Sequence, residues 1–154
     1  MDLLDEFTTL IAALEAQNID YATCGGLALA VHGHVRATKD IDLLIKPEDL
    51  DKAFSVAKEQ GFDIEGLPLS FDGGSTQIRR LSKIDSESKL LVTVDFLLVT
   101  QQAEAIWEGR QRAEWGSGSA WVVSKRGLIE MKLRAGRDQD LLDIKRLQEN
   151  DDES

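Results

Sequence analysis

Two aspartates, Asp40 and Asp42, are the residues of this sequence best placed to do chemistry. They open an apolar segment, residues 40–45, whose composition predicts a β-strand. Because side chains alternate between the two faces of a strand, both carboxylates point to one face, about 6.5–7 Å apart along the backbone. Two unpaired carboxylates this close repel each other, and Mg²⁺ prefers carboxylate oxygens together with substrate phosphates. The pair therefore predicts a divalent-cation site.

A glycine pair, Gly25-Gly26, lies upstream of the aspartates, between a predicted strand at 21–24 and a predicted helix at about 26–31. Glycines permit a tight turn and let another group approach the backbone closely. The first turn of the helix offers free N–H groups and a positive dipole end to an anion. Alone, the glycines are explained by a structural turn and the aspartates by a solvated strand edge. Together they predict a site for a metal-chelated nucleotide.

The segment from Thr23 to Ile45 resembles the signature of the nucleotidyltransferase superfamily with a polymerase-beta-like core, which is Gly-Gly or Gly-Ser, a spacer, and then Asp-apolar-Asp. Residues 36–39, Arg-Ala-Thr-Lys, resemble the Arg-x-Thr-x-Asp form found in small members, including AbiEii-type toxins and some antibiotic nucleotidyltransferases. The resemblance implies an α/β (α+β) chain with the minimal nucleotidyltransferase fold, a mixed β-sheet flanked by helices.

A third aspartate, Asp95, interrupts the strongest strand signal of the chain, residues 90–99. A charged residue inside a nearly continuous apolar strand needs a partner. A lysine, an arginine or a backbone N–H at a strand end would suffice. The resemblance instead implies that Asp95 is a third carboxylate of the metal site, because the superfamily places one on a downstream strand of this character.

The C-terminal segment, residues 132–144, resembles the Lys…Arg…Asp-x-x-Asp pattern near the end of AbiEii-like domains. The resemblance implies that Lys132 lies near the nucleotide phosphates. Arg137 and Asp140 are also explained as an i,i+3 pair on a helix surface. No role is assigned to Arg137, Asp140 or Asp143.

The function implied by the resemblance is a metal-dependent transfer of a nucleoside monophosphate from a nucleoside triphosphate, such as ATP, to an acceptor hydroxyl. Asp40, Asp42 and Asp95 would be both catalytic and metal-binding. They would hold two Mg²⁺ ions, or Mn²⁺ in place of Mg²⁺. The expected nucleotide-binding residues are Gly25, Gly26, Arg36, Thr38 and Lys132. The acceptor is RNA or tRNA, a protein, or a small molecule.

The partners implied by the resemblance follow from its toxin members. The protein would be the toxin of a toxin–antitoxin system with a cognate antitoxin, or a partner subunit would bind the acceptor. The toxin relatives are often longer than this chain, with a further C-terminal region for the acceptor. The alternative function is a catalytically weak nucleotide-binding module that acts through a partner protein.

Composition limits the other possibilities. The 154 residues are expected to form one domain, residues 1–150, followed by an acidic tail at 151–154. The net charge of −10 opposes general DNA binding, because phosphate contacts dominate that affinity. No apolar run is long enough for a membrane span. Cys24 is the only cysteine and the N-terminus lacks the basic region of a signal peptide, so a cytoplasmic location is expected.

The remaining pattern predicts the scaffold that positions these residues. Helices are predicted at 2–17, 47–61, 101–112, 124–135 and 138–147, the last with Leu141, Leu142, Ile144 and Leu147 inward. Further strands are predicted at 62–64, 77–84 and 120–123, with a loop at 66–75 and a hairpin turn at 85–89. The arginines of strand 77–84 are interpreted as a solvated edge, with an acceptor surface as the alternative.

Overall fold

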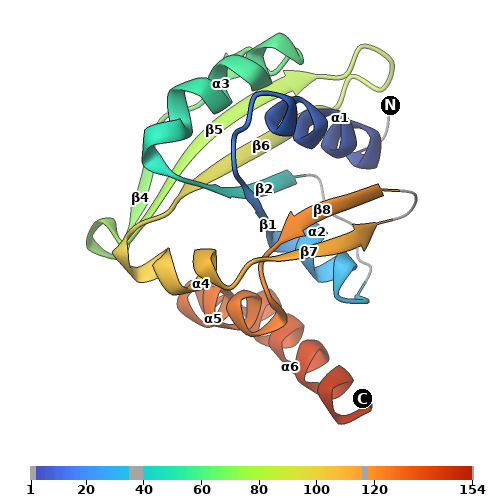
Figure 1. Cartoon of the computed structure of the whole chain (residues 1–154), viewed down its shortest axis with the longest axis vertical. Coiled ribbons are helices and arrows are strands. Elements are labelled where there is room, and N and C mark those ends of the chain that lie inside the picture. Colours follow the sequence, from blue (N-terminus) through green and yellow to red (C-terminus); the bar gives the residue numbers. More distant parts are fainter. Residues whose placement is uncertain (1–2, 35–39, 116–117, 154) are drawn as a thin grey trace.

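The structure is a computed structural model that describes residues 3–34, 40–115 and 118–153 (Figure 1). Its α-helices are α1 (Leu3–Ala16), α2 (Gly25–Val31), α3 (Leu50–Glu59), α4 (Glu104–Glu108), α5 (Lys125–Ala135) and α6 (Asp138–Glu153). Its strands are β1 (Ala22–Cys24), β2 (Asp40–Ile45), β3 (Ile64–Glu65), β4 (Leu69–Phe71), β5 (Thr76–Ile84), β6 (Leu91–Leu98), β7 (Gln111–Trp115) and β8 (Gly118–Val122). Short 3-10 turns, at 47–49, 72–74 and 101–103, complete the regular structure of the described residues.

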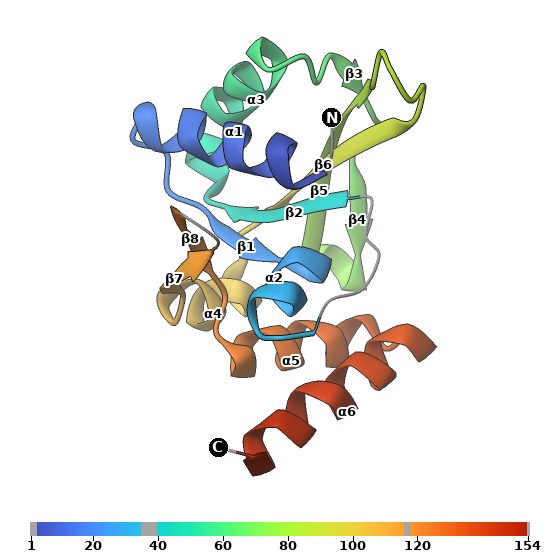
Figure 2. The same cartoon turned by 90° about the vertical axis from the view of Figure 1, so that its right-hand side faces the viewer.

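The strands form one mixed sheet in the order β3-β5-β6-β2-β1-β8-β7, with β4 paired to β5. At its centre β2 runs parallel to β6 and antiparallel to β1. Figure 2 shows α1 and α3 on one face of the sheet and α4, α5 and α6 on the other. The sheet flanked by helices is the arrangement that the sequence predicted. No helix within the described ranges is long and apolar enough to cross a membrane.

Strand β2 divides its side chains between the two faces of the sheet. Ile41, Leu43 and Ile45 are buried with α1 and α3 in one apolar core. Leu44 belongs to a second core with residues of α2, α4, α5 and α6. By the alternation of a strand, Asp40 and Asp42 therefore lie on the face of the second core. The apolar half of β2 anchors the strand, and the polar half faces the space beside α2.

Two segments differ from the expected secondary structure. The helix expected over 101–112 is a 3-10 turn and the five-residue α4, which ends before Gly109, and β7 begins at Gln111. β7 pairs antiparallel with β8, from Gln111 opposite Val122 to Trp115 opposite Gly118. The loop expected over 66–75 contains β4, which pairs with β5. In both cases pairing with a partner strand, which local sequence does not reveal, decides the structure.

The last helix buries a different face from the one expected. Leu141 and Leu142 are about half exposed, whereas Ile144 and Leu147 are buried as expected. Asp140 and Asp143 take the remaining inward positions of the helix and are fully buried. The inward face is thus i, i+3, i+4 and i+7 from residue 140, half acidic and half apolar. α6 also continues through residues 151–153, the positions that the sequence assigns to an acidic tail.

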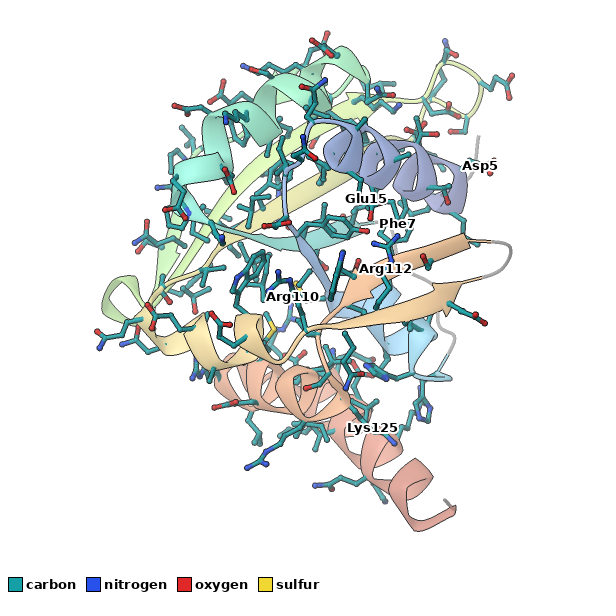
Figure 3. All side chains as sticks on the ribbon, in the orientation of Figure 1. Asp5, Phe7, Glu15, Arg110, Arg112 and Lys125 are labelled. Atoms are coloured by element: carbon teal, nitrogen blue, oxygen red, sulfur yellow. The ribbon has the colours of Figure 1, made fainter. Side chains whose placement is uncertain are left out.

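Arginines attach the β7 edge to its neighbours (Figure 3). The guanidinium carbon of Arg110 lies 4.1 Å from the ring centre of Trp107 and 5.1 Å from that of Trp121. Arg112 of β7 pairs with Glu15 of α1. Stacking of guanidinium on indole is favourable, and here it connects α4 to β8. The tryptophans therefore serve as packing residues of this edge.

Candidate active site

Four strands bring one row of residues into register on the face of the second core. Cys24 of β1 is opposite Asp42 of β2, and Asp42 is opposite Asp95 of β6. Asp95 is in turn opposite Arg80 of β5. Neighbouring strands lie about 4.8 Å apart, so the two aspartates predicted for the metal site stand side by side. Asp40, two residues before Asp42, lies in the adjacent row opposite Thr93.

Gly25 joins this row from the start of α2. Its φ of +65° is in the left-handed region that favours glycine. A β-carbon at this position would lie 2.0 Å from Oδ2 of Asp42. The absence of a side chain at Gly25 is therefore what allows the Asp42 carboxylate to reach the first turn of α2. Gly26 follows as a buried residue of the same turn.

The electrostatics of the row centre on Asp42. Burial, followed by the negative charges of Asp95 and Asp40, raises the pKa of Asp42 to about 7, while Lys132 and Arg80 act in the opposite direction. Burial and the same neighbouring carboxylates also raise the pKa of the Cys24 thiol well above its usual range. The thiol is therefore a neutral neighbour, and the site carries more negative charge than its basic side chains compensate.

Asp95 is held by Arg80. Nε of Arg80 donates to Oδ1 of Asp95 at 2.7 Å, and Nη2 donates to Oδ2 at 3.0 Å. The Asp95 side chain is 7% exposed and the Arg80 side chain is 43% exposed, so the pair runs from the interior of the sheet toward solvent. One step further along the same face, the hydroxyls of Ser82 and Thr93 are 3.0 Å apart. This bidentate contact, called the Arg80 fork below, fixes the orientation of the Asp95 carboxylate.

Lys132 lies in a buried ionic cluster between α5 and α6. Its Nζ is 2.9 Å from Oδ2 of Asp143 and 3.7 Å from Oδ1 of Asp140. Asp140 also accepts hydrogen bonds from the backbone N–H and the guanidinium of Arg137, which lower its pKa against the effect of burial. Asp143 accepts a further bond from Gln139. The ammonium is thus fixed by two carboxylates, and its charge still lowers the pKa of Asp42.

The predicted site residues are brought together to different degrees. Gly25, Asp42 and Asp95 adjoin one another, while Asp40 and Lys132 act on Asp42 through their charges. Arg36 and Thr38 lie outside the described residues. In the part of the chain that the structure describes, no group of three His, Cys, Asp or Glu side chains is arranged to hold a metal ion. The three-aspartate metal centre therefore stays a prediction.

Arg80 is the site residue that the sequence interpretation missed, because it was assigned to a solvated edge. A signal for it existed. The turn predicted at 85–89 sets the register of the strands on either side, with Ile84 opposite Leu91. Counting back from that pair places Arg80 directly opposite Asp95, and opposite charges at such positions attract each other.

Comparison with known proteins identifies the family. Residues 1–129 match a protein family described as "Uncharacterised nucleotidyltransferase". The chain belongs to this nucleotidyltransferase family. The superfamily predicted from the segment Thr23 to Ile45 is confirmed, and the AbiEii-like subtype stays a prediction. No curated protein matches the sequence significantly.

Solved structures of low sequence identity share the fold. The lincosamide antibiotic adenylyltransferase LnuA, bound to lincomycin, aligns with a TM-score of 0.58 and 14% identity over 94% of this chain and 95% of its own. The antibiotic-resistance factor ANT(2'')-Ia aligns with a TM-score of 0.64 and 16% identity over 96% of this chain and 83% of its own. A second structure of ANT(2'')-Ia, in complex with adenylyl-2''-tobramycin, gives 0.60 and 16% over 92% and 84%. The mixed sheet flanked by helices is the fold that these proteins have in common.

Proposed function

We propose that the protein transfers a nucleoside monophosphate from a nucleoside triphosphate to an acceptor hydroxyl, with Asp40, Asp42 and Asp95 as ligands of Mg²⁺. The observation that carries the proposal is the position of the Asp42 carboxylate, against Gly25 and beside Asp95. Burial, followed by the negative charges of Asp95 and Asp40, raises the pKa of Asp42 to about 7, so its ionised form is costly without a further cation nearby. A divalent cation supplies the missing positive charge, and aspartate oxygens are the donors that Mg²⁺ prefers.

In this proposal the side chains of the row hold the reactants. The acceptor oxygen attacks the α-phosphorus, the bond to the β-phosphate oxygen breaks, and pyrophosphate leaves. Backbone N–H groups at Gly25 and Gly26, at the start of α2, would meet the triphosphate. Lys132 contributes positive charge near Asp42. Bound Mg²⁺ would neutralise charge on the phosphates and lower the pKa of the attacking hydroxyl.

The acceptor in this proposal is a small molecule with a hydroxyl group. Two proteins that share the fold have been solved with small molecules: LnuA with bound lincomycin, and ANT(2'')-Ia in complex with adenylyl-2''-tobramycin. The net charge of −10 favours a cationic or neutral acceptor over a nucleic acid. A toxin that modifies tRNA or a protein, with a cognate antitoxin, is the other form of the proposal.

An acceptor panel separates these forms. The protein would be incubated with Mg²⁺ and each α-labelled triphosphate in turn, together with tobramycin, lincomycin, tRNA or a cell protein extract. Label on an antibiotic supports a small-molecule acceptor, and label on tRNA or a protein supports the toxin form. Asp42→Asn serves as the inactive control in every reaction.

The alternative is a catalytically weak nucleotide-binding module that acts through a partner protein. The observation that favours it is the fork of Arg80, which holds both oxygens of the third carboxylate. Magnesium-dependent binding of a triphosphate in calorimetry, without label on any acceptor, would support this alternative. Label on any acceptor excludes it.

A further inference from the structure

Among the residues that the structure describes, Arg80 is a basic residue in direct contact with the predicted metal site. Its Nε and Nη2 atoms bind the two oxygens of Asp95 at 2.7 and 3.0 Å. A bidentate contact of this kind fixes the carboxylate in its plane and occupies one lone pair on each oxygen. The hydrogen bond to Asp95, followed by the charges of Asp95, Asp40 and Asp42, raises the pKa of Arg80, so the guanidinium is charged at every pH of interest.

The backbone around Arg80 is built to leave space for it on this face. Gly66 donates its N–H to the carbonyl of Arg80 at 2.9 Å. A β-carbon at Gly66 would approach that of Arg80 to 3.3 Å, closer than an ordinary contact. The inner end of the pair is closed and the outer end is open, because the Arg80 side chain is 43% exposed. The guanidinium is therefore open to solvent on the side away from Asp95.

Arg80 and a cation require the same oxygens. A divalent ion bound by Asp42 and Asp95 would need a lone pair that faces the space between their strands. The guanidinium competes for these oxygens, and its charge also opposes an incoming cation. Lys132 cannot replace Arg80 as the partner of Asp95, because its ammonium is fixed on Asp143 and Asp140 in the cluster between α5 and α6.

We propose that Arg80 is a positioning residue of the transfer site, which orients the Asp95 carboxylate for transfer and competes with the divalent cation for it. The proposal rests on the nucleotidyl transfer proposed above. Removal of Arg80 is expected to change cation affinity and transfer rate in opposite directions. Without Arg80 the cation binds more tightly, because a competitor and a positive charge are gone. Transfer nevertheless becomes slower, because a carboxylate free to rotate no longer holds the geometry of the reaction.

The test combines Mn²⁺ binding with transfer rates. Free Mn²⁺ would be titrated by electron paramagnetic resonance without nucleotide, using wild type, Arg80→Gln and Arg80→Lys. Arg80→Gln should bind Mn²⁺ about tenfold more tightly and transfer at least about tenfold more slowly, mainly through kcat. Arg80→Lys keeps the charge and loses the fork, so its Mn²⁺ affinity should lie between those of wild type and Arg80→Gln while its rate falls similarly.

Arg79→Gln is the matched control. It removes the same charge from the neighbouring position of β5, where the guanidinium binds Gln77 and the carbonyl of Ile78 and has no contact with Asp95. Its Mn²⁺ affinity and rate should equal those of wild type. In an Asp95→Asn background, Arg80→Gln should tighten Mn²⁺ binding less than it does in wild type, because the charge is still removed but the competition for Asp95 is already gone.

Weaker or unchanged Mn²⁺ binding in folded Arg80→Gln would overturn the proposal, as would a wild-type rate in Arg80→Lys. If Arg80→Gln does not fold, Arg80→Lys and its rate decide. A failure of the underlying function looks different. In that case Asp42→Asn leaves Mn²⁺ binding unchanged, or neither wild type nor any variant at position 80 binds Mn²⁺.

Discussion

The carboxylate of Asp42 occupies the space that any side chain at position 25 would need. A β-carbon on Gly25 would lie 2.0 Å from Oδ2 of Asp42. Gly25 of the glycine pair and Asp42 of the aspartate pair, which are separate in the sequence, therefore meet at this point. The site is built around this contact. Substitution of Gly25 tests the space that the contact needs, and substitution of Asp42 tests its charge.

Gly25→Ala should lose most of its transfer activity and destabilise the fold. The β-carbon displaces the Asp42 carboxylate, and the left-handed φ of +65° costs an alanine roughly 1 kcal/mol in addition. Transfer rate and urea denaturation would be measured together. Gly73→Ala is the control, because Gly73 has the same φ of +65° and nothing within 4 Å of the added carbon. It should lose stability by the strain alone and keep its activity. Equal activity losses in the two variants would contradict the proposed contact.

Asp42→Asn should make the metal-free protein more stable at pH 8. Burial and the neighbouring carboxylates raise the pKa of Asp42 to about 7 in the folded state, above its value of 3.8 in the unfolded chain. The folded state therefore binds the proton more tightly, and stability falls as the pH rises from about 4 to about 7. The cost above pH 7 is on the order of 4 kcal/mol. An asparagine at position 42 carries no charge and therefore avoids this cost.

Urea denaturation at pH 5 and pH 8 measures this effect, and the stability advantage of Asp42→Asn should grow between them. Asp85→Asn provides a control of opposite sign. Hydrogen bonds from the hydroxyl and N–H of Ser88 lower the pKa of Asp85, so its charge stabilises the fold above its unfolded pKa. Asp85→Asn should therefore lose stability at pH 8. An Asp42→Asn protein that is less stable than wild type at pH 8 would refute the charge imbalance.

Binding of Mg²⁺ should be linked to release of the Asp42 proton. Below pH 7 the cation must displace that proton, so its apparent affinity should fall about tenfold for each pH unit. Calorimetry in buffers of different ionisation enthalpy would count the protons released. At pH 6 about one proton should leave for each site filled, and well above pH 7 none. An affinity that is constant from pH 5.5 to pH 8 would show that Asp42 is not a ligand.

Lys132→Met should destabilise the protein by about 3–5 kcal/mol, because it leaves the buried Asp140 and Asp143 without their shared ammonium. Urea denaturation measures the loss. Arg126→Met removes the same charge from an exposed position of α5 and should change stability by no more than about 0.5 kcal/mol. Similar values for the two variants would show that the cluster does not hold α5 to α6. The phosphate role of Lys132 is then tested by the KM for triphosphate in variants that remain folded.

The strands that carry the site were predictable because their signals are local. Alternation placed Asp40 and Asp42 on one face, and the apolar run of β6 identified Asp95 as an exception that needed a partner. The resemblance placed Asp95 at the same site, but the parallel register that puts Asp42 beside Asp95 does not follow from local sequence, since it pairs residues that are 53 positions apart. For the same reason the first two residues of β7, Gln111 and Arg112, fall in a predicted helix, and β4 falls in a predicted loop.

The inward face of α6 shows a second limit. Hydrophobicity selects Leu141 and Leu142, yet the helix buries Asp140 and Asp143. Burial of two carboxylates is possible because Lys132, on another helix, lies within 4 Å of both. Local sequence could not reveal this, because the charged partner belongs to the tertiary structure. The resemblance of residues 132–144 to a family pattern singled out these residues without explaining them.

The most direct test of the central claim compares wild type with Asp42→Asn in transfer of label from an α-labelled triphosphate. Both proteins would be assayed with Mg²⁺ at equal folded concentration, on the acceptor identified in the panel. We predict magnesium-dependent labelling by wild type, with release of one pyrophosphate for each label transferred. We predict no labelling above background by Asp42→Asn, which remains folded. Labelling by Asp42→Asn at the wild-type rate would contradict the assignment of this row of residues as the transfer site.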